Sequence, residues 1–250
     1  MPKYTPMIEQ YLSIKAEVQD AFLFFRLGDF YELFFEDAIA ASRELEITLT
    51  GREGGTEERI PMCGVPYHSA EAYIMKLIEK GYKVAICDQV EDPATAKGVV
   101  RREIVRIITP GTVMEGKSLG DGQNNFIVGI AEIGDQIGLA ACDLSTGEFY
   151  AAFMESSLDF VWDEISNYSP SEVVGEHEVL GKMQGIAGSV VQKTVFTVYD
   201  RADPKVLSAH FSSSEFSSLA DAASAAATTL LTYLNETQKR SLSHITRIQS

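Results

Sequence analysis

The chain contains 250 residues, of which 45% are apolar and 23% are charged, a composition typical of soluble globular proteins. It has no run of about 18 apolar residues, which excludes a membrane-spanning helix. With 21 basic and 36 acidic residues its formal net charge is −15, so general affinity for nucleic acid is not expected. Only residues 97–106 carry a local net positive charge, with four basic residues and one acidic residue. This segment could make a local contact with nucleic acid.

The three cysteines are Cys63, Cys87 and Cys142. They are odd in number and widely spaced, and no CxxC pair occurs, so neither a disulfide framework nor a zinc ribbon is expected. This usage favours a reducing cytoplasm.

The first 115 residues predict one α/β domain. Apolar spacing predicts helices, short apolar or alternating runs predict strands, and residues 51–59 are a charged, Gly-rich loop. In chain order we expect a helix over 6–19, a strand over 21–27, a helix over 30–45, a strand over 47–50, a helix over 69–80, and strands over 83–87 and 99–108.

Residues 116–125 have no apolar period and are interpreted as an interdomain linker. Residues 126–240 then predict a second α/β domain, whose hairpin strands and later alternating elements indicate a mixed sheet of ribonuclease H-like architecture. The expected strands cover 126–133, 137–143, 147–153, 172–174 and part of 189–198, and the expected helices cover 158–167, 177–186 and 215–234. Residues 241–250 are expected to begin a further, truncated domain, with a strand over 242–248.

The segment LGDFYELF at residues 27–34 supports two interpretations. In the first, Asp29 is the N-cap of a helix, Glu32 completes a capping box, and Phe30 is one more buried aromatic. In the second, Phe30 follows a glycine at a strand-to-helix turn and projects outward, with a carboxylate two residues further on. Such a pair is suited to probing a nucleic-acid base.

The stretch FRLGDFYELF at residues 25–34 resembles the mismatch-recognition segment of the MutS family of bacterial DNA mismatch repair proteins, including its Phe-x-Glu motif. The resemblance is dense over residues 4–115 and thinner from residue 126, where it rests on DLSTGE at 143–148 and on the order of elements. Its other motifs are IPMCGVPYH at 60–68, VAICDQ at 84–89, DPATAKG at 92–98 and ITPGT at 108–112.

The resemblance implies a mismatch-recognition domain followed by a connector domain, in a binding module without catalytic activity of its own. The family's ATPase part is absent from such a fragment, so ATP and Mg are cofactors of the full-length protein only. Mismatched double-stranded DNA is the implied ligand, and MutL is the implied partner of the connector. The full-length protein is expected to be a homodimer in the bacterial cytoplasm, associated with the nucleoid when it binds DNA.

The resemblance also implies roles for Phe30 and Glu32. Phe30 would enter the minor groove and stack on a base, which is worth ~1–3 kcal/mol, while opening a base step costs a few kcal/mol. The two roughly cancel at a Watson–Crick step, but a mismatch has already lost pairing and stacking, so insertion there becomes favourable. A Glu32 carboxylate in the negative groove would penalise intact duplex, and burial there would raise its pKa. It would be tolerated only if it is protonated or accepts a hydrogen bond from the displaced base.

Four basic residues are candidates for contacts with DNA phosphates: Arg52, Lys97, Arg101 and Arg102. The alternative for each is an ordinary solvated surface position. Phosphate contacts position a protein without adding sequence specificity. We therefore expect the isolated chain to bind DNA weakly.

Two further patterns suggest an enzyme instead. Residues 111–118 (GTVMEGKS) match the P-loop pattern GxxxxGK[ST], but the following LGDGQNN is a poor helix start, and a P-loop must open a helix. Asp143 on a strand of a ribonuclease H-like sheet suggests a two-metal nuclease, but no other carboxylate is tied to it by a recognisable spacing. The alternative role for Asp143 is to cap the turn at 145–147. No catalytic residues and no metal site are predicted.

Overall fold

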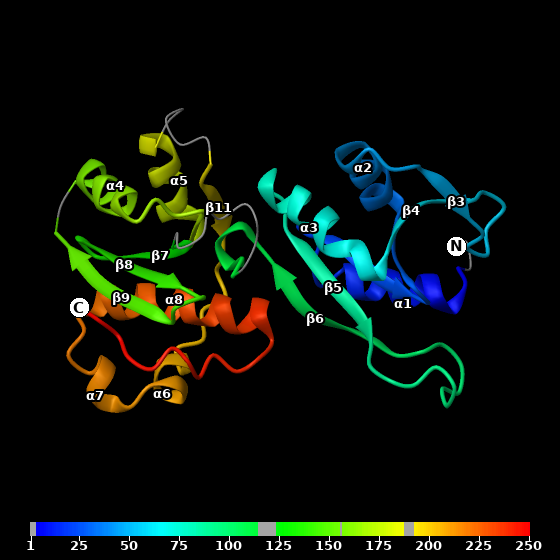
Figure 1. Cartoon of the computed structure of the whole chain (residues 1–250). Helices are drawn as coiled ribbons and strands as arrows, with labels where there is room; N and C mark the ends of the chain where they lie inside the picture. Colours follow the sequence, from blue (N-terminus) through cyan, green and yellow to red (C-terminus); the bar gives the residue numbers. More distant parts are fainter. Residues whose placement is uncertain (1–3, 115–123, 156, 188–192) are drawn as a thin grey trace. The chain divides into compact units, whose positions relative to one another are not determined.

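The structure is a computed structural model that describes residues 4–114, 124–155, 157–187 and 193–250. The chain folds into two compact units, one ending at Thr109 and the other beginning at Pro110 (Figure 1). Each unit contains one β-sheet with helices packed against it, so the predicted α/β class with two domains is confirmed. Most of the predicted linker, and the second half of the P-loop match, lie outside the described residues.

The first unit is built on a six-stranded sheet in the order β3-β4-β2-β1-β5-β6. Strands β1 and β5 are parallel, and all other neighbours in this sheet are antiparallel. The strands are β1 (Phe22–Leu27), β2 (Phe30–Phe34), β3 (Thr50–Arg52), β4 (Ile60–Pro66), β5 (Val84–Gln89) and β6 (Arg102–Ile108). The helices are α1 (Pro6–Lys15), α2 (Phe35–Leu45) and α3 (Ala70–Glu79), the last preceded by the 3-10 turn η1 (Tyr67–Ser69).

The structure corrects the prediction of a single helix over residues 30–45. Residues 30–34 form β2, which pairs with β1 on one side and β4 on the other, and the helix begins only at Phe35. Gly28 lies in the turn that joins β1 to β2 with a φ of +56°, a left-handed conformation that glycine adopts without steric cost. Asp29 is the other turn residue and Glu32 lies inside β2, so the predicted capping box is wrong.

Helices cover both faces of this sheet. On one face α1 packs through Ile8 and Tyr11 against the apolar side chains of β1 and of the end of β2, including Phe25 and Phe34. Helices α2 and α3 pack on β4 and its neighbours. Because side chains alternate along a strand, Phe30, Glu32 and Phe34 of β2 lie on the same face of the sheet. Helix α1 covers this face at Phe34 and leaves the other end of β2 uncovered.

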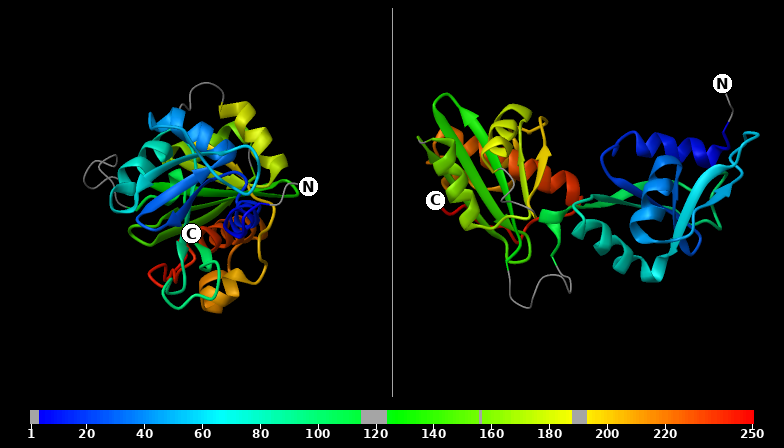
Figure 2. Two further views of the ribbon diagram at one scale, coloured as in Figure 1. Left: turned by 90° about the vertical axis from the view of Figure 1, so that its right-hand side faces the viewer. Right: turned by 90° about the horizontal axis from the view of Figure 1, so that it is seen from above.

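The second unit contains a five-stranded sheet in the order β11-β10-β7-β8-β9. Helix α8 packs on one face, and α4 and α5 pack on the other, as Figure 1 shows. In the right-hand view of Figure 2, α8 (orange to red) lies behind the green strands. The strands are β7 (Phe126–Ile133), β8 (Gln136–Asp143), β9 (Glu148–Met154), β10 (Glu172–Gly175) and β11 (Val195–Val198). The helices are α4 (Leu158–Asn167), α5 (His177–Ala187), α6 (Val206–His210), α7 (Ser213–Phe216) and α8 (Asp221–Gln238), with the 3-10 turn η2 at Pro110–Thr112.

The predicted hairpin strands of this unit are confirmed almost to the residue, but its last part differs from the prediction. The Ala-rich helix runs from Asp221 to Gln238 instead of over 215–234. The predicted strand over 242–248 does not form. Leu242 and Ile245 are buried in the core of the second unit, and only Gln249 makes a β-bridge, to Tyr150 of β9. Residues 241–250 thus pack as part of the second compact unit.

Candidate nucleic-acid interface

Phe30 is a large aromatic side chain held in the open at the first position of β2. Its backbone is fixed between Leu27 of β1 and Pro66 of β4, and the Asp29 carbonyl next to it accepts a hydrogen bond of 2.8 Å from the Tyr67 amide. In spite of this firm anchoring the side chain is 47% exposed, while Phe34 at the other end of β2 is fully buried. The structure therefore favours the interpretation in which Phe30 projects outward, although from a hairpin and not from a helix start.

Glu32 lies on the same face as Phe30, and its carboxylate forms an ion pair with Arg52 of β3. The Nη1 atom of Arg52 donates to both carboxylate oxygens, at 3.1 and 2.8 Å. The Glu32 side chain is only 13% exposed, and that of Arg52 is 40% exposed. Burial raises the pKa of Glu32, and the adjacent Arg52 guanidinium opposes that rise. Arg52, predicted to contact phosphate, is thus the counterion of Glu32 in this structure.

The turn at Phe30 and the loop between β5 and β6 lie at the same end of the sheet. β1 and the parallel β5 end there, at Leu27 and Gln89, and β6 starts there opposite Gln89. The loop carries Lys97 and Arg101, and both side chains are exposed. The topology therefore brings these two predicted phosphate contacts to the end of the sheet that displays Phe30.

Arg102 does not fit its predicted role, because its side chain points into the fold. The residue is 6% exposed, and its guanidinium lies 4.8 Å from the centre of the Phe25 ring. It donates to the Arg26 carbonyl at 2.7 Å, to Gln10 Oε1 of α1 at 2.9 Å and to the Val100 carbonyl. Burial lowers the pKa of Arg102. These contacts connect α1, β1 and β6. The prediction that Arg102 contacts phosphate is therefore wrong.

A cluster on the opposite face of the hairpin was not predicted. The Arg26 guanidinium lies 3.5 Å from the centre of the Tyr67 ring, and Arg26 Nε donates to the Gly28 carbonyl at 2.6 Å. The Tyr31 hydroxyl donates to Asp88 Oδ1 at 2.7 Å. These contacts brace the turn from behind, which fixes the position of Phe30. Only the pairing of β1, β2 and β4 brings these residues together, so their sequence spacing gives no signal.

The two enzyme alternatives find no support in the described residues. Asp143 is buried, and its Oδ1 accepts from the Ser145 amide at 2.8 Å and the Ser145 hydroxyl at 2.6 Å, while Oδ2 accepts from the Asn125 amide at 3.2 Å. This is the turn-capping role. Gly111 of the P-loop match lies in η2, where its amide donates to the buried Glu172 at 3.1 Å and is not presented to a ligand. Among the residues with described positions, no group of three or more His, Cys, Asp or Glu side chains could hold a metal ion.

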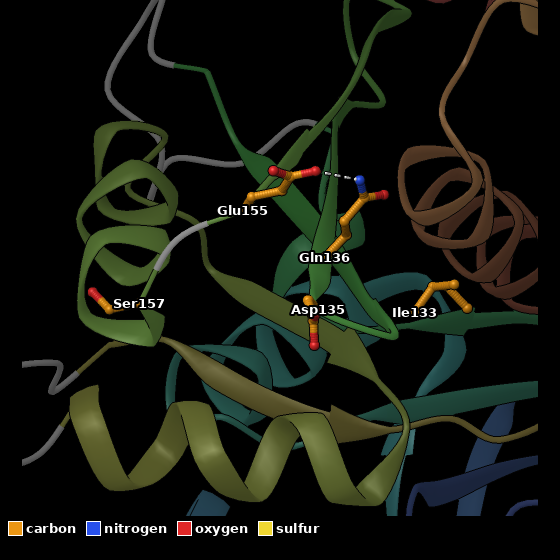
Figure 3. A pocket seen from close by; sticks show the side chains of 5 residues that line it. All are labelled: Ile133, Asp135, Gln136, Glu155 and Ser157. Atoms are coloured by element: carbon orange, nitrogen blue, oxygen red, sulfur yellow. Dashed lines mark hydrogen bonds between the residues drawn. The ribbon is translucent and has the colours of Figure 1, made fainter.

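The second unit has a cavity of about 590 Å³ beside the turn between β7 and β8 (Figure 3). It is lined by Ile133, Asp135, Gln136, Glu155 and Ser157, and the Gln136 amide donates to Glu155 at 2.8 Å. Among the residues with described positions, its charged lining side chains are the acidic Asp135 and Glu155, and none is basic. With two carboxylates in its lining, this cavity is not a candidate for phosphate contacts.

Comparison with known proteins places the chain in a family of DNA repair proteins. The model of MutS domain I matches residues 5–117, and the model of MutS domain II matches residues 125–246. Together these matches cover nearly the whole chain.

The chain belongs to the MutS family. It is 52% identical over 246 residues to the DNA mismatch repair protein MutS of Brevibacillus brevis, covering 98% of this chain and 28% of that protein. It is 53% identical over 257 aligned positions to MutS of Bacillus pumilus and 51% identical over 254 to MutS of Bacillus subtilis, in both cases over 100% of this chain and 28% of the relative.

The chain spans little more than a quarter of the length of these relatives. The matched parts are domains I and II, which lack the ATPase domain of the family. In the described part of the chain no helix is both long enough and apolar enough to cross a membrane.

Proposed function

We propose that the first unit recognises mismatched or unpaired positions in double-stranded DNA, with Phe30 as an aromatic wedge and Glu32 as a carboxylate probe. The observation that carries the proposal is the geometry of β2. It fixes the backbone of an exposed Phe30 within a braced hairpin and places Glu32 two residues away on the same face. A wedge must be rigid, because a flexible side chain would lose ordering entropy on insertion.

The energetic basis of discrimination is the deformability of the DNA. Stacking of a base on Phe30 is worth ~1–3 kcal/mol, and opening an intact step costs a few kcal/mol. An intact step therefore offers little net gain, while a mismatched step is already weakened. The Glu32 carboxylate adds a penalty wherever the groove offers no hydrogen-bond donor.

We further propose that the second unit acts as a connector in a longer polypeptide. It would relay the DNA-bound state to an ATPase part that uses ATP and Mg, and it would offer a surface to MutL. The membership of the family supports this, as does the matched domain II. The complete protein would act as a homodimer in the bacterial cytoplasm.

The test of the wedge is Phe30→Ala in the complete polypeptide that contains this chain. We expect the ratio of affinities for a duplex with one unpaired base and for the matched duplex, at one salt concentration, to fall about fivefold or more, because ~1–3 kcal/mol of stacking is lost. Binding to matched duplex should persist. The matched control is Phe160→Ala on α4, since Phe160 is also exposed, at 57%. An unchanged ratio in the Phe30 variant would refute the proposal.

The basic residues of the same sheet end give a separate prediction. Arg101→Met or Lys97→Met should weaken binding to matched and mismatched duplex alike, and each should reduce the slope of log affinity against log salt by about one. Arg102→Met should leave that slope unchanged and lower the urea midpoint of the first unit, because its contacts are internal. A reduced slope in the Arg102 variant would restore the phosphate contact predicted from the sequence.

A further inference from the structure

The ion pair between Glu32 and Arg52 has an unusual placement within the sheet. Glu32 lies on β2 and Arg52 on the edge strand β3, and β4 separates the two strands. Arg52 must therefore extend across β4 to reach the carboxylate. Gly64 of β4 stands directly opposite Glu32 and presents no side chain there, and a methyl group at this position would lie 3.5 Å from Glu32 Cγ. The sheet thus leaves space beside Glu32 for this contact.

Arg52 is the charged side chain that contacts the Glu32 carboxylate. The cross-strand neighbours of Glu32 are Phe25 on β1 and Gly64 on β4, and α1, which packs on this face, contacts β2 through Tyr11 at Phe34. Arg102, which lies over Phe25 on this face, makes its hydrogen bonds to Gln10 and to backbone carbonyls, and the cation in contact with Glu32 is Arg52. Because the Glu32 side chain is only 13% exposed, its carboxylate depends on this counterion to stay ionised.

We propose that Arg52 is a positioning residue for Glu32: it fixes the carboxylate in place and keeps it charged, and thereby sets how strongly the protein rejects intact duplex. This proposal rests on the proposed function, since it assigns Glu32 the role of a probe. The Arg52 nitrogen contacts both oxygens, which locks the rotation of the carboxylate. Each oxygen still has a lone pair with which to accept a hydrogen bond from a displaced base.

The consequence is a defined dependence on pH. Burial raises the pKa of Glu32, and removing Arg52 removes the influence that opposes this rise. At a given pH a larger fraction of the carboxyl would then be protonated and neutral. A neutral carboxyl does not repel the groove and can donate a hydrogen bond, so binding to intact duplex would strengthen as the pH falls. Discrimination would be lost from the acidic side, by at most tenfold per pH unit for one proton.

The experiment compares the wild type, Arg52→Met, Arg52→Lys and the double variant Arg52→Met with Glu32→Gln, each in the complete polypeptide. The affinity ratio for unpaired-base and matched duplexes is measured from about pH 5.5 to about pH 8.5, on the side above the ordinary glutamate pKa of about 4.3. We expect a nearly flat profile for the wild type and for Arg52→Lys. The Arg52→Met ratio should fall about three- to tenfold toward low pH. The double variant should be flat, because glutamine does not titrate.

Two outcomes would overturn this role of Arg52. One is an Arg52→Met profile parallel to that of the wild type, which would make Arg52 a phosphate contact or a surface residue. The other is the same pH dependence in the double variant, which would assign the titration to another group. If Phe30→Ala leaves discrimination unchanged, the proposed function itself fails; if Phe30→Ala abolishes it while Arg52→Met behaves as the wild type, only the role of Arg52 fails.

Discussion

Replacing Glu172 with alanine should destabilise the second unit by about 3 kcal/mol or more, because it removes a buried acceptor and leaves several donors unsatisfied, at about 1–3 kcal/mol for each unsatisfied group. Glu172 is fully buried at the start of β10. Its Oε1 accepts hydrogen bonds from the Thr197 hydroxyl of β11 at 2.6 Å and from the Tyr233 hydroxyl of α8 at 2.7 Å. Its Oε2 accepts from the Gly111 amide of η2 at 3.1 Å. One carboxylate therefore joins three segments that are far apart in the sequence.

The measurement is urea unfolding of the 250-residue chain followed by the fluorescence of Trp162. This is the chain's single tryptophan and it lies on α4, so the signal reports the second unit alone. The matched control is Glu178→Ala on α5, whose side chain is 85% exposed and forms an ion pair with Lys182 at 3.6 Å. That variant should change stability by less than about 0.5 kcal/mol. Equal unfolding midpoints for the two variants would show that the Glu172 network contributes no net stability.

The sequence predicted the second unit well, because its strands are defined locally. β7, β8 and β9 alternate in polarity or are continuously apolar, and short turns rich in Gly, Asp, Ser and Thr separate them. Such hairpins form between neighbours in the sequence, so pattern and turn chemistry suffice. Residues 241–250 were predicted less well. Leu242 and Ile245 alternate like strand residues but are buried by tertiary packing without strand pairing.

The helix predicted over residues 30–34 was wrong because this strand depends on a partner that is distant in the sequence. Their spacing fits a helix as well as a strand, and Asp29 with Glu32 imitates a capping box. These residues form a strand because they pair with β4, which lies some thirty residues further along the chain. A local pattern cannot reveal this partner. The candidate site depends on it, since only a strand places Phe30 and Glu32 on one face while Tyr31 turns to the other.

The basic residues show the same limit of sequence reasoning. Arg101 and Arg102 are adjacent and chemically identical, yet one is exposed and the other is 6% exposed, because β6 begins between them and strand alternation turns the second side chain inward. Arg52 is held by Glu32. Of the four predicted phosphate contacts, only Lys97 and Arg101 have exposed side chains, and Arg101 also forms an exposed ion pair with Glu103 at 3.5 Å. With only two exposed candidates for phosphate contacts among the four, we still expect a chain of net charge −15 to bind DNA weakly by itself.

Replacing Gly138 with alanine should destabilise the second unit by about 3 kcal/mol, which is typical of a strongly overpacked core site. Gly138 lies in β8 beneath the first turn of α8. A methyl group there would lie 1.8 Å from the Ala222 carbonyl oxygen and 2.3 Å from its carbonyl carbon. The obstacle is helix backbone, so a side-chain rotation cannot relieve it and α8 itself must move. Gly129 of β7 faces the same helix at Leu230, which explains why α8 is rich in alanine: helix and sheet approach each other closely.

The control for this change is Gly181→Ala in α5, where a methyl group would meet no atom within 4 Å. Because alanine is a better helix former than glycine, this variant should be more stable than the wild type by about 0.5–1 kcal/mol. Two glycine-to-alanine changes in one unit are thus expected to shift the Trp162 unfolding midpoint in opposite directions. A Gly138 variant as stable as the wild type would mean that α8 does not approach the sheet as closely as the structure has it. The Gly138 variant tests the close contact between α8 and β8, because the change at Gly138 does not affect α4 and α5 on the other face of the sheet.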